Sequence, residues 1–280
     1  MSKFNFQRAT ARPRVVLLHS SASSSRQWSP LIEALQPTFD TRAVDLHGHG
    51  AQPAWSGNRL LTLADEAALV EPLLHAAGGV HLVGHSYGGA VAAKVATMFP
   101  KLVRSLAVFE PVLFRALVDD NPQAEAMQEF AGLTAMLGRH LDAGDDHSAA
   151  QIFVSYWAGR GAWGHMPADR RGAIAARMRA VHPQFDTLIR DDFDFDRLPD
   201  CPTLFLTGAT TVASTRRIGE IARRRRPQAR HRVLDGMGHM GPITHAAAVN
   251  RVLEQFLREC EAPRATPLLW GWSELVSAPA

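Results

Sequence analysis

The sequence is poor in cysteine and in long apolar runs. Its two cysteines, Cys201 and Cys260, lie far apart and in no metal-ligand spacing, so both are expected to be reduced thiols, and no metal site is expected. The N-terminal residues contain no apolar signal stretch, and no later run reaches the length of a membrane span. We therefore expect a cytoplasmic protein with no membrane partner.

Neither sign of charge is in large excess, and lysine is rare. Lysine occurs only at Lys3, Lys94 and Lys101, and the formal net charge of the 280-residue chain is +3. An imbalance this small does not indicate a nucleic-acid partner. The one dense basic run, the four arginines at residues 223–226, precedes Pro227 and is expected to form the last turn of a helix, where cations complement exposed carbonyl groups.

Short apolar runs alternate with helical patterns, and no internal repeat occurs. Apolar residues make up 46% of the chain, which is typical of a globular protein with a substantial core. The alternation predicts a doubly wound, mostly parallel α/β sheet. Strands are expected at residues 15–19, 41–46, 80–83, 102–109, 203–207 and 231–234, and helices at 26–35, 63–77, from 89 onward, and at 246–259.

The alternation stops in the middle of the chain. Residues 113–197 have helical patterns and aromatic side chains but no buried strand, which predicts a helical cap inserted into a core formed by residues 1–112 and 198–262. The C-terminal tail, residues 263–280, carries Trp270 and Trp272, and these two tryptophans favour docking of the tail over a free end.

The most informative motif is Gly-His-Ser-Tyr-Gly at residues 84–88, which lies between an apolar strand and a helix of small residues. A turn this tight places Ser86 in a strained backbone conformation with its hydroxyl above the end of the sheet. Gly84 and Gly88 stand where a Cβ would collide with the neighbouring strand and helix. The motif predicts Ser86 as a nucleophile, with simple helix capping as the alternative.

Four sequence motifs follow one another along the chain. They are Leu-Leu-His at residues 17–19, Asp-x-x-Gly-His-Gly at 45–50, the motif at 84–88, and Gly238 followed by His239. On these motifs the chain resembles the α/β-hydrolase superfamily over about residues 13–260. The resemblance implies the α/β-hydrolase fold, and no cofactor is expected. The family usually has two strands before the one that ends at His19, but few residues precede Val15. We therefore expect the sheet to be shortened at this edge, where residues 4–6 could supply one short strand.

The resemblance also implies a catalytic triad in the order serine, acid, histidine, with His239 as the base. The family most often places the acid at the position of Thr211, and residues 208–214 contain no carboxylate. Glu110 ends the strand after the nucleophile helix, where a minority branch that includes haloalkane dehalogenases places its acid. We expect Glu110 to orient His239, with Asp235 as the alternative.

The oxyanion hole is expected to use two backbone N–H groups, those of Tyr87 and Ser21. The family usually has a glycine after the histidine of this loop, and here Ser20 replaces it. The alternative is that the serine-rich residues 20–25 form only a flexible loop. The histidines at positions 19, 47, 49 and 85 are expected to have structural roles in turns rather than to bind a metal.

The aromatic residues of the inserted segment suggest where a substrate lies. A substrate pocket is expected to be lined by some of six apolar side chains: Trp28, Phe114, Tyr156, Trp157, Trp163 and Met240. No clustered Arg or Lys occurs in the motif loops to bind a phosphate or a carboxylate. An uncharged, moderately apolar ester of small to medium size is therefore the expected substrate.

The sequence predicts a serine hydrolase that cleaves carboxylic esters through an acyl-enzyme intermediate. The same residues could serve a carbon–carbon bond hydrolase or a lactonase, or a hydrolase-like protein that binds a ligand without turnover. Epoxide hydrolase and dehalogenase chemistry is disfavoured, because those branches use an aspartate where Ser86 stands. The expected partner is a small-molecule ester, and assembly as a homodimer is left open.

Overall fold

The computed structural model describes residues 12–262. The edge strand expected at residues 4–6 and the tail at 263–280 lie outside the described residues. None of the helices between residues 12 and 262 combines the length and apolar composition needed to cross a membrane.

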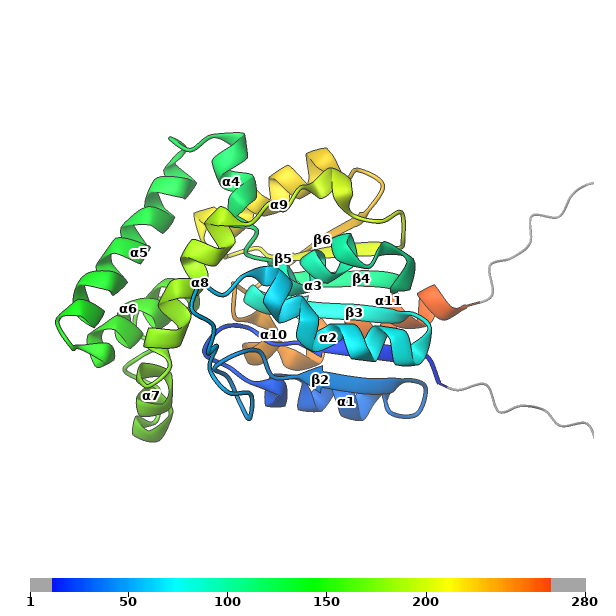
Figure 1. Ribbon diagram of the computed structural model, residues 1–280, viewed down its shortest axis with the longest axis horizontal. Coiled ribbons are helices and arrows are strands. Elements are labelled where there is room, and N and C mark those ends of the chain that lie inside the picture. The colour runs from blue at the N-terminus through cyan, green and yellow to red at the C-terminus, as the bar shows by residue number, and fades with distance from the viewer. Residues whose placement is uncertain (1–11, 263–280) are drawn as a thin grey trace, which may run out of the picture.

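One parallel sheet of six strands forms the centre of the molecule (Figure 1), in the order β2-β1-β3-β4-β5-β6. All five strand pairs are parallel, which confirms the predicted fold class. The strands are β1 (Arg14–Leu18), β2 (Asp40–Val44), β3 (Val80–His85), β4 (Val103–Phe109), β5 (Thr203–Gly208) and β6 (Arg230–Leu234).

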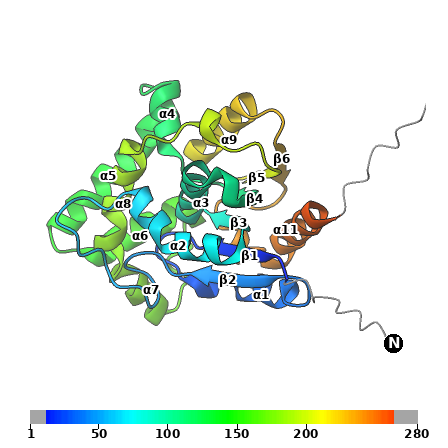
Figure 2. The ribbon, with the colours of Figure 1, turned by 45° about the vertical axis from the view of Figure 1, so that its right-hand side comes forward.

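Helices cover both faces of this sheet, and side chains alternate between the two faces along each strand. In β1, Val16 and Leu18 join one apolar cluster, whereas Val15 and Leu17 join the other. The first face is covered by α2 (Leu63–Ala77), α3 (Tyr87–Met98) and α9 (Ala213–Arg225), and the second by α1 (Ser29–Leu35) and α11 (Ala246–Glu261). Figure 2 shows α2 and α11 on opposite sides of the strands.

Local sequence signals explain where several elements begin and end. Helix α2 has the predicted bounds because the Thr62 hydroxyl accepts the N–H of Asp65, while Gly78 ends the helix at a φ of 64°. The helix expected at 26–35 is instead a 3₁₀ turn, η1 (Ser25–Trp28), followed by α1, because Pro30 favours a fresh helix start at Ser29.

Five helices lie between β4 and β5, and no strand interrupts them. They are α4 (Phe114–Asp120), α5 (Glu125–Asp142), α6 (Asp146–Ala158), α7 (Ala168–Ala175) and α8 (Met178–Arg190). Figure 1 shows them gathered at one end of the sheet, the end at which the parallel strands terminate. Buried Lys94 of α3 pairs with Asp191, 3.0 Å away, and so ties the end of α8 to the sheet layer. That these helices form a separate cap domain stays a prediction.

The remaining elements are short. Helix α10 (Gly241–Thr244) precedes α11, and the 3₁₀ turns η2 (Pro100–Leu102) and η3 (Phe195–Arg197) precede β4 and β5. Helix α10 follows directly on the loop that carries His239 and therefore helps to place this loop at the end of the sheet.

Candidate active site

Ser86 lies at the sharp turn between β3 and α3. Its φ of 55° and ψ of −120° confirm the predicted strained conformation. A Cβ on Gly84 would collide with the Gly88 carbonyl, and a Cβ on Gly88 would collide with the ends of β1 at Leu18 and His19, so both glycines are required. The Ser86 N–H donates to the Phe109 carbonyl over 3.0 Å and fixes the turn against β4.

His239 is carried by the loop that follows β6. Its Nε2 lies 2.9 Å from Ser86 Oγ, within hydrogen-bond distance of the hydroxyl. The loop is held by His85, whose Nε2 lies 2.8 Å from the His239 carbonyl oxygen. Because Gln27 Nε2 faces His85 Nδ1 at 3.1 Å, His85 Nδ1 accepts and its Nε2–H donates to that carbonyl.

Glu110 follows the last residue of β4, at a φ of 43°, and is 2% exposed. Its Oε2 lies 2.7 Å from His239 Nδ1, so the three side chains form one hydrogen-bonded chain from Ser86 to Glu110. The carboxylate also accepts the N–H of Gly208 at Oε1 (2.7 Å) and the hydroxyl of Thr211 at Oε2 (2.6 Å). These donors stabilise a buried charge that would otherwise be costly.

Thr211 therefore contacts the Glu110 carboxylate, which we expect to be the acid. The family most often has its carboxylate at this position, and here the threonine hydroxyl donates to the carboxylate that arrives from β4. Asp235, the alternative acid, is exposed and is not among the hydrogen-bond partners of His239.

The loop after β1 is held in place by side chains. Ser20 uses both its N–H and its hydroxyl to donate to Gln27 Oε1, at 3.1 and 2.9 Å, so the residue that replaces glycine anchors the loop. The next turn passes through Ala22 at a φ of 58°, with its N–H bonded to His49 Nε2 at 3.0 Å. Within residues 12–262 the N–H groups of Ser21 and Tyr87 have no hydrogen-bond acceptor.

Three other buried histidines surround the site, and each bonds to backbone groups. His19 accepts the N–H of Leu46 at 3.1 Å, and its second ring nitrogen bonds to the Ser20 carbonyl. Burial lowers the pKa of His19 to about 4 and also lowers the pKa values of His49 and His85. The neutral rings hold the turns of the site together, and the described residues contain no group of three or more His, Cys, Asp or Glu arranged for a metal ion.

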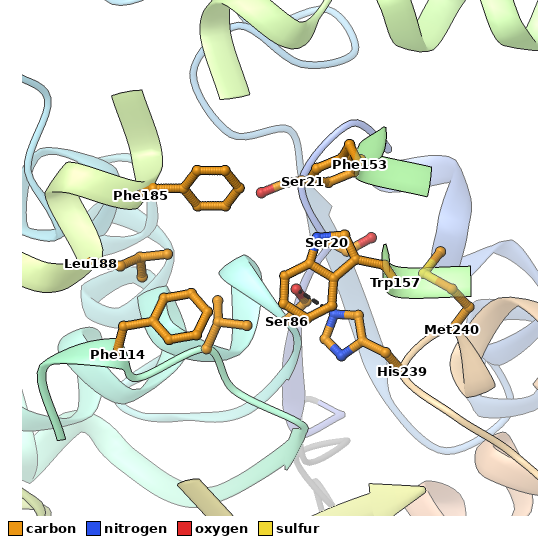
Figure 3. Close-up of a pocket in the computed structure, with 11 residues that line it drawn as sticks. Ser20, Ser21, Ser86, Phe114, Phe153, Trp157, Phe185, Leu188, His239 and Met240 are labelled. Atoms are coloured by element: carbon orange, nitrogen blue, oxygen red, sulfur yellow. Dashed lines mark hydrogen bonds between the residues drawn. The ribbon is translucent and has the colours of Figure 1, made fainter. Parts of the chain in front are cut away.

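An inner pocket opens above Ser86 (Figure 3). It has a volume of about 30 Å³, and its apolar wall comes from the inserted helices and the segment before them. The lining residues are Ser20, Ser21, Ser86, Val112, Phe114, Phe153, Trp157, Phe185, Leu188, His239 and Met240. The indole of Trp157 lies over the imidazole of His239, with ring centroids 4.2 Å apart, so it covers this ring.

Three of the six residues expected in the pocket line it, namely Phe114, Trp157 and Met240. The prediction was wrong for the other three. Trp28 is buried instead in the apolar cluster between the sheet and helices α1 and α11. Tyr156 packs edge-on against Trp157, with ring centroids 4.6 Å apart, and its hydroxyl bonds to Glu129 (2.6 Å) and Ser214 (2.8 Å) instead of lining the pocket.

Trp163, in the loop before α7, also does not line the pocket. It packs against His147, and the guanidinium of Arg171 lies over its ring. Phe185 and Leu188 were missed. The two residues recur at helical spacing in α8. This spacing predicts that one face of the helix is buried, but it does not indicate which part of the molecule that face packs against. The Tyr87 side chain also points away from the site, to Glu66 Oε1 at 3.1 Å.

A larger outer cavity of about 600 Å³ adjoins the inner pocket. The two share the side chains of Ser20, Ser21, Phe153, Trp157 and Met240. A molecule with a reacting group at Ser86 can therefore place a small part in the inner pocket and extend its larger part into the outer cavity.

Known proteins resemble this chain over most of its length. The alpha/beta hydrolase family model matches residues 15–252. The chain is 26% identical over 260 residues to an (E)-2-((N-methylformamido)methylene)succinate hydrolase of Acinetobacter baylyi, covering 90% of this chain and 92% of that protein. It is 27% identical over 267 residues to a pimeloyl-[acyl-carrier protein] methyl ester esterase of Methylococcus capsulatus, covering 88% and 94%.

Other relatives match over less of their length, since the chain spans 29%, 37% and 56% of three curated proteins. Among solved structures, a hydrolase from Pseudomonas aeruginosa has a TM-score of 0.72 at 22% identity, covering 88% of this chain and 90% of that one. A likeness at this identity supports the fold alone.

Proposed function

Because the chain belongs to the alpha/beta hydrolase family, we propose that it is a serine hydrolase that cleaves carboxylic esters through an acyl-enzyme intermediate. The observation that carries this proposal is the hydrogen-bonded chain from Ser86 through His239 to Glu110. A serine hydroxyl is a weak nucleophile until a positioned base accepts its proton, and a carboxylate must hold that base in the right tautomer.

In the first half-reaction Ser86 Oγ attacks the ester carbonyl carbon while His239 Nε2 takes the hydroxyl proton. Glu110 stays ionised, accepts the N–H at Nδ1 and stabilises the imidazolium. When the carbon–oxygen bond breaks, His239 returns the proton to the leaving alcohol. A water molecule then attacks the acyl-enzyme with the same base, and this step releases the carboxylic acid and restores Ser86.

The negative charge on the carbonyl oxygen needs fixed donors. The N–H groups of Ser21 and Tyr87 are suited to this role, because neither has an acceptor within residues 12–262 and both flank Ser86. The Tyr87 N–H belongs to the first residue of α3, where helix geometry leaves N–H groups unsatisfied. A loop anchored through Ser20 and Gln27 keeps the second donor in place without reorganisation.

The inner pocket supports a small, uncharged, apolar group on one side of the scissile bond. Val112, Phe114, Phe185 and Leu188 supply its apolar wall, and its volume of about 30 Å³ leaves little space beyond a short chain. Two relatives that match along most of their length are named for hydrolysis, one of a methyl ester and one of a substituted succinate. Location in the cytoplasm and assembly as a homodimer stay predictions.

The test is a panel of short-chain methyl and nitrophenyl esters, lactones and β-diketones, incubated with the purified protein and its Ser86→Ala variant. We expect Ser86-dependent turnover that is fastest for esters, with Ser29→Ala as the control for loss of an exposed serine hydroxyl. Faster turnover of β-diketones would favour a carbon–carbon hydrolase. Absence of Ser86-dependent turnover on the whole panel would favour a protein that binds a ligand without catalysis.

A further inference from the structure

The outer cavity carries charge of one sign. Three arginines line it, Arg26, Arg170 and Arg177, and no aspartate or glutamate does. Arg26 comes from η1 in the core, whereas the other two come from α7 and the start of α8 among the inserted helices. No single loop contains this cluster, which explains why the sequence predicts an uncharged substrate.

None of the three arginines has a carboxylate within ion-pair distance in the part of the chain that the structure describes. Other arginines of the chain differ in this respect. Arg179 pairs with Asp146 at 2.8 Å, and Arg217 pairs with both Asp120 and Glu220. The cavity wall therefore carries three guanidinium groups and no carboxylate that pairs with them.

Arg177 is the best placed of the three. It is half-buried, and its Nη1 donates to the Ala173 carbonyl at 2.7 Å, which holds the guanidinium at the cavity wall with further N–H groups unused. Its charge contributes to lowering the pKa values of His19 and His49, after the larger effect of burial. The guanidinium is therefore near the site in space as well as in the cavity wall.

We propose that the outer cavity binds an anionic group, a carboxylate or a phosphate, on the part of the substrate that extends away from the inner pocket. A guanidinium recognises either anion through paired N–H donors. The apolar part of the same wall, including Ala162, Met166 and Ile174, suits a hydrocarbon spacer between this anion and the scissile bond. This inference rests on the proposed function for the position of the scissile bond.

Binding to the inactive Ser86→Ala protein tests the anion site without requiring turnover. Calorimetric titration compares monomethyl adipate with dimethyl adipate, and 4-acetoxybenzoate with 4-acetoxybenzamide. The two pairs place the anion on the acyl side or on the alcohol side of the ester. A third probe, 4-acetoxyphenyl phosphate, distinguishes phosphate from carboxylate.

We expect the anionic member of at least one pair to bind about ten-fold more tightly or better, because charged hydrogen bonds of this kind are worth one to two orders of magnitude in affinity. Arg177→Gln should abolish most of this preference. Arg139→Gln is the matched control, since Arg139 is exposed in α5 and does not line the cavity.

Equal binding of the charged and neutral members of both pairs, with the phosphate no tighter, would overturn the anion site. The anion site would also be overturned if the preference for the anionic ligand remained in the Arg177→Gln variant and in the Arg26→Gln, Arg170→Gln double variant. Hydrolysis of the neutral esters by the wild-type protein reports separately on the proposed function. Failure of one proposal can therefore be told from failure of the other.

Discussion

Backbone strain within the described residues is confined to positions beside the candidate site. Only three non-glycine residues between 12 and 262 have positive φ, namely Ala22, Ser86 and Glu110. Each follows the carboxyl end of a strand, and the three lie, in this order, in the loop after β1, at the proposed nucleophile and at the proposed acid. A strained backbone conformation costs about 1–3 kcal/mol per residue and persists only where the surrounding structure holds it in place. Strained residues that cluster in one region are therefore typical of a functional site.

At the residue scale, we predict that Glu110→Gln lowers kcat about 10³–10⁴-fold while the protein stays folded. The amide cannot stabilise the imidazolium of His239, and its NH₂ group favours the wrong tautomer of the ring. Steady-state kinetics on the best ester measures the effect, with Glu125→Gln on exposed α5 as the control. Turnover near the wild-type rate would mean that another residue supplies the acid.

At the scale of elements, the site depends on how closely α3 approaches β1. The start of α3 packs against the carbonyl groups at the end of β1, and only glycine at position 88 allows this distance. The same contact holds the start of α3, with Ser86 and Tyr87, next to the loop that follows β1. Packing between helix and strand therefore sets the geometry of the expected oxyanion hole.

Two glycine substitutions test this dependence. We expect Gly88→Ala to lower the free energy of unfolding by about 3 kcal/mol or more, because the added Cβ meets backbone atoms that cannot move aside. Gly132→Ala in the exposed middle of α5 meets no atom and should raise it by about 0.5–1 kcal/mol. Urea denaturation measures both, and a stable, fully active Gly88→Ala protein would refute the packing argument.

At the scale of the whole molecule, the sequence predicts the fold better than the substrate site. The strands and the turn around Ser86 follow from local apolar runs and glycine positions. His239 and Glu110 each follow the end of a strand, so their meeting follows from a parallel sheet. The roles of these residues in catalysis stay predictions.

Other features required the three-dimensional structure. Amphipathic α8 shows a buried face in the sequence, but not that Phe185 and Leu188 face Ser86 rather than the core. Trp28 is apolar, as a pocket residue would be, but it is buried in the apolar cluster between the sheet and helices α1 and α11. The arginines of the outer cavity come from segments about 145 residues apart in the chain, and only packing of the inserted helices against the core brings them together.

Global stability should also respond to one buried acid. Glu66 of α2 accepts the His47 N–H and the Tyr87 hydroxyl, both at 3.1 Å, and so links α2 to α3 and to the turn after β2. Burial raises its pKa to about 7. Because the folded state holds this proton more tightly than the unfolded state, the stabilisation is present below pH 4.5 and is lost as the pH rises through 7.

We therefore predict that Glu66→Gln becomes more stable relative to the wild type as the pH rises, by about 3 kcal/mol between pH 4.5 and pH 8. Groups such as His19 titrate in both proteins, so their contributions to the pH dependence of stability cancel in the difference between the two. Denaturant unfolding at several pH values measures it. A difference between the two proteins that does not change with pH would contradict the buried-acid account.

In the proposed mechanism Ser86 is a nucleophile that His239 activates. The most direct measurement is labelling with a fluorophosphonate, followed by mass spectrometry of the labelled peptide. The account predicts one adduct per chain, located on Ser86, at a rate that falls at least about 10³-fold in His239→Ala. Absence of an adduct on Ser86 in the folded wild-type protein, or unchanged labelling without His239, would contradict it.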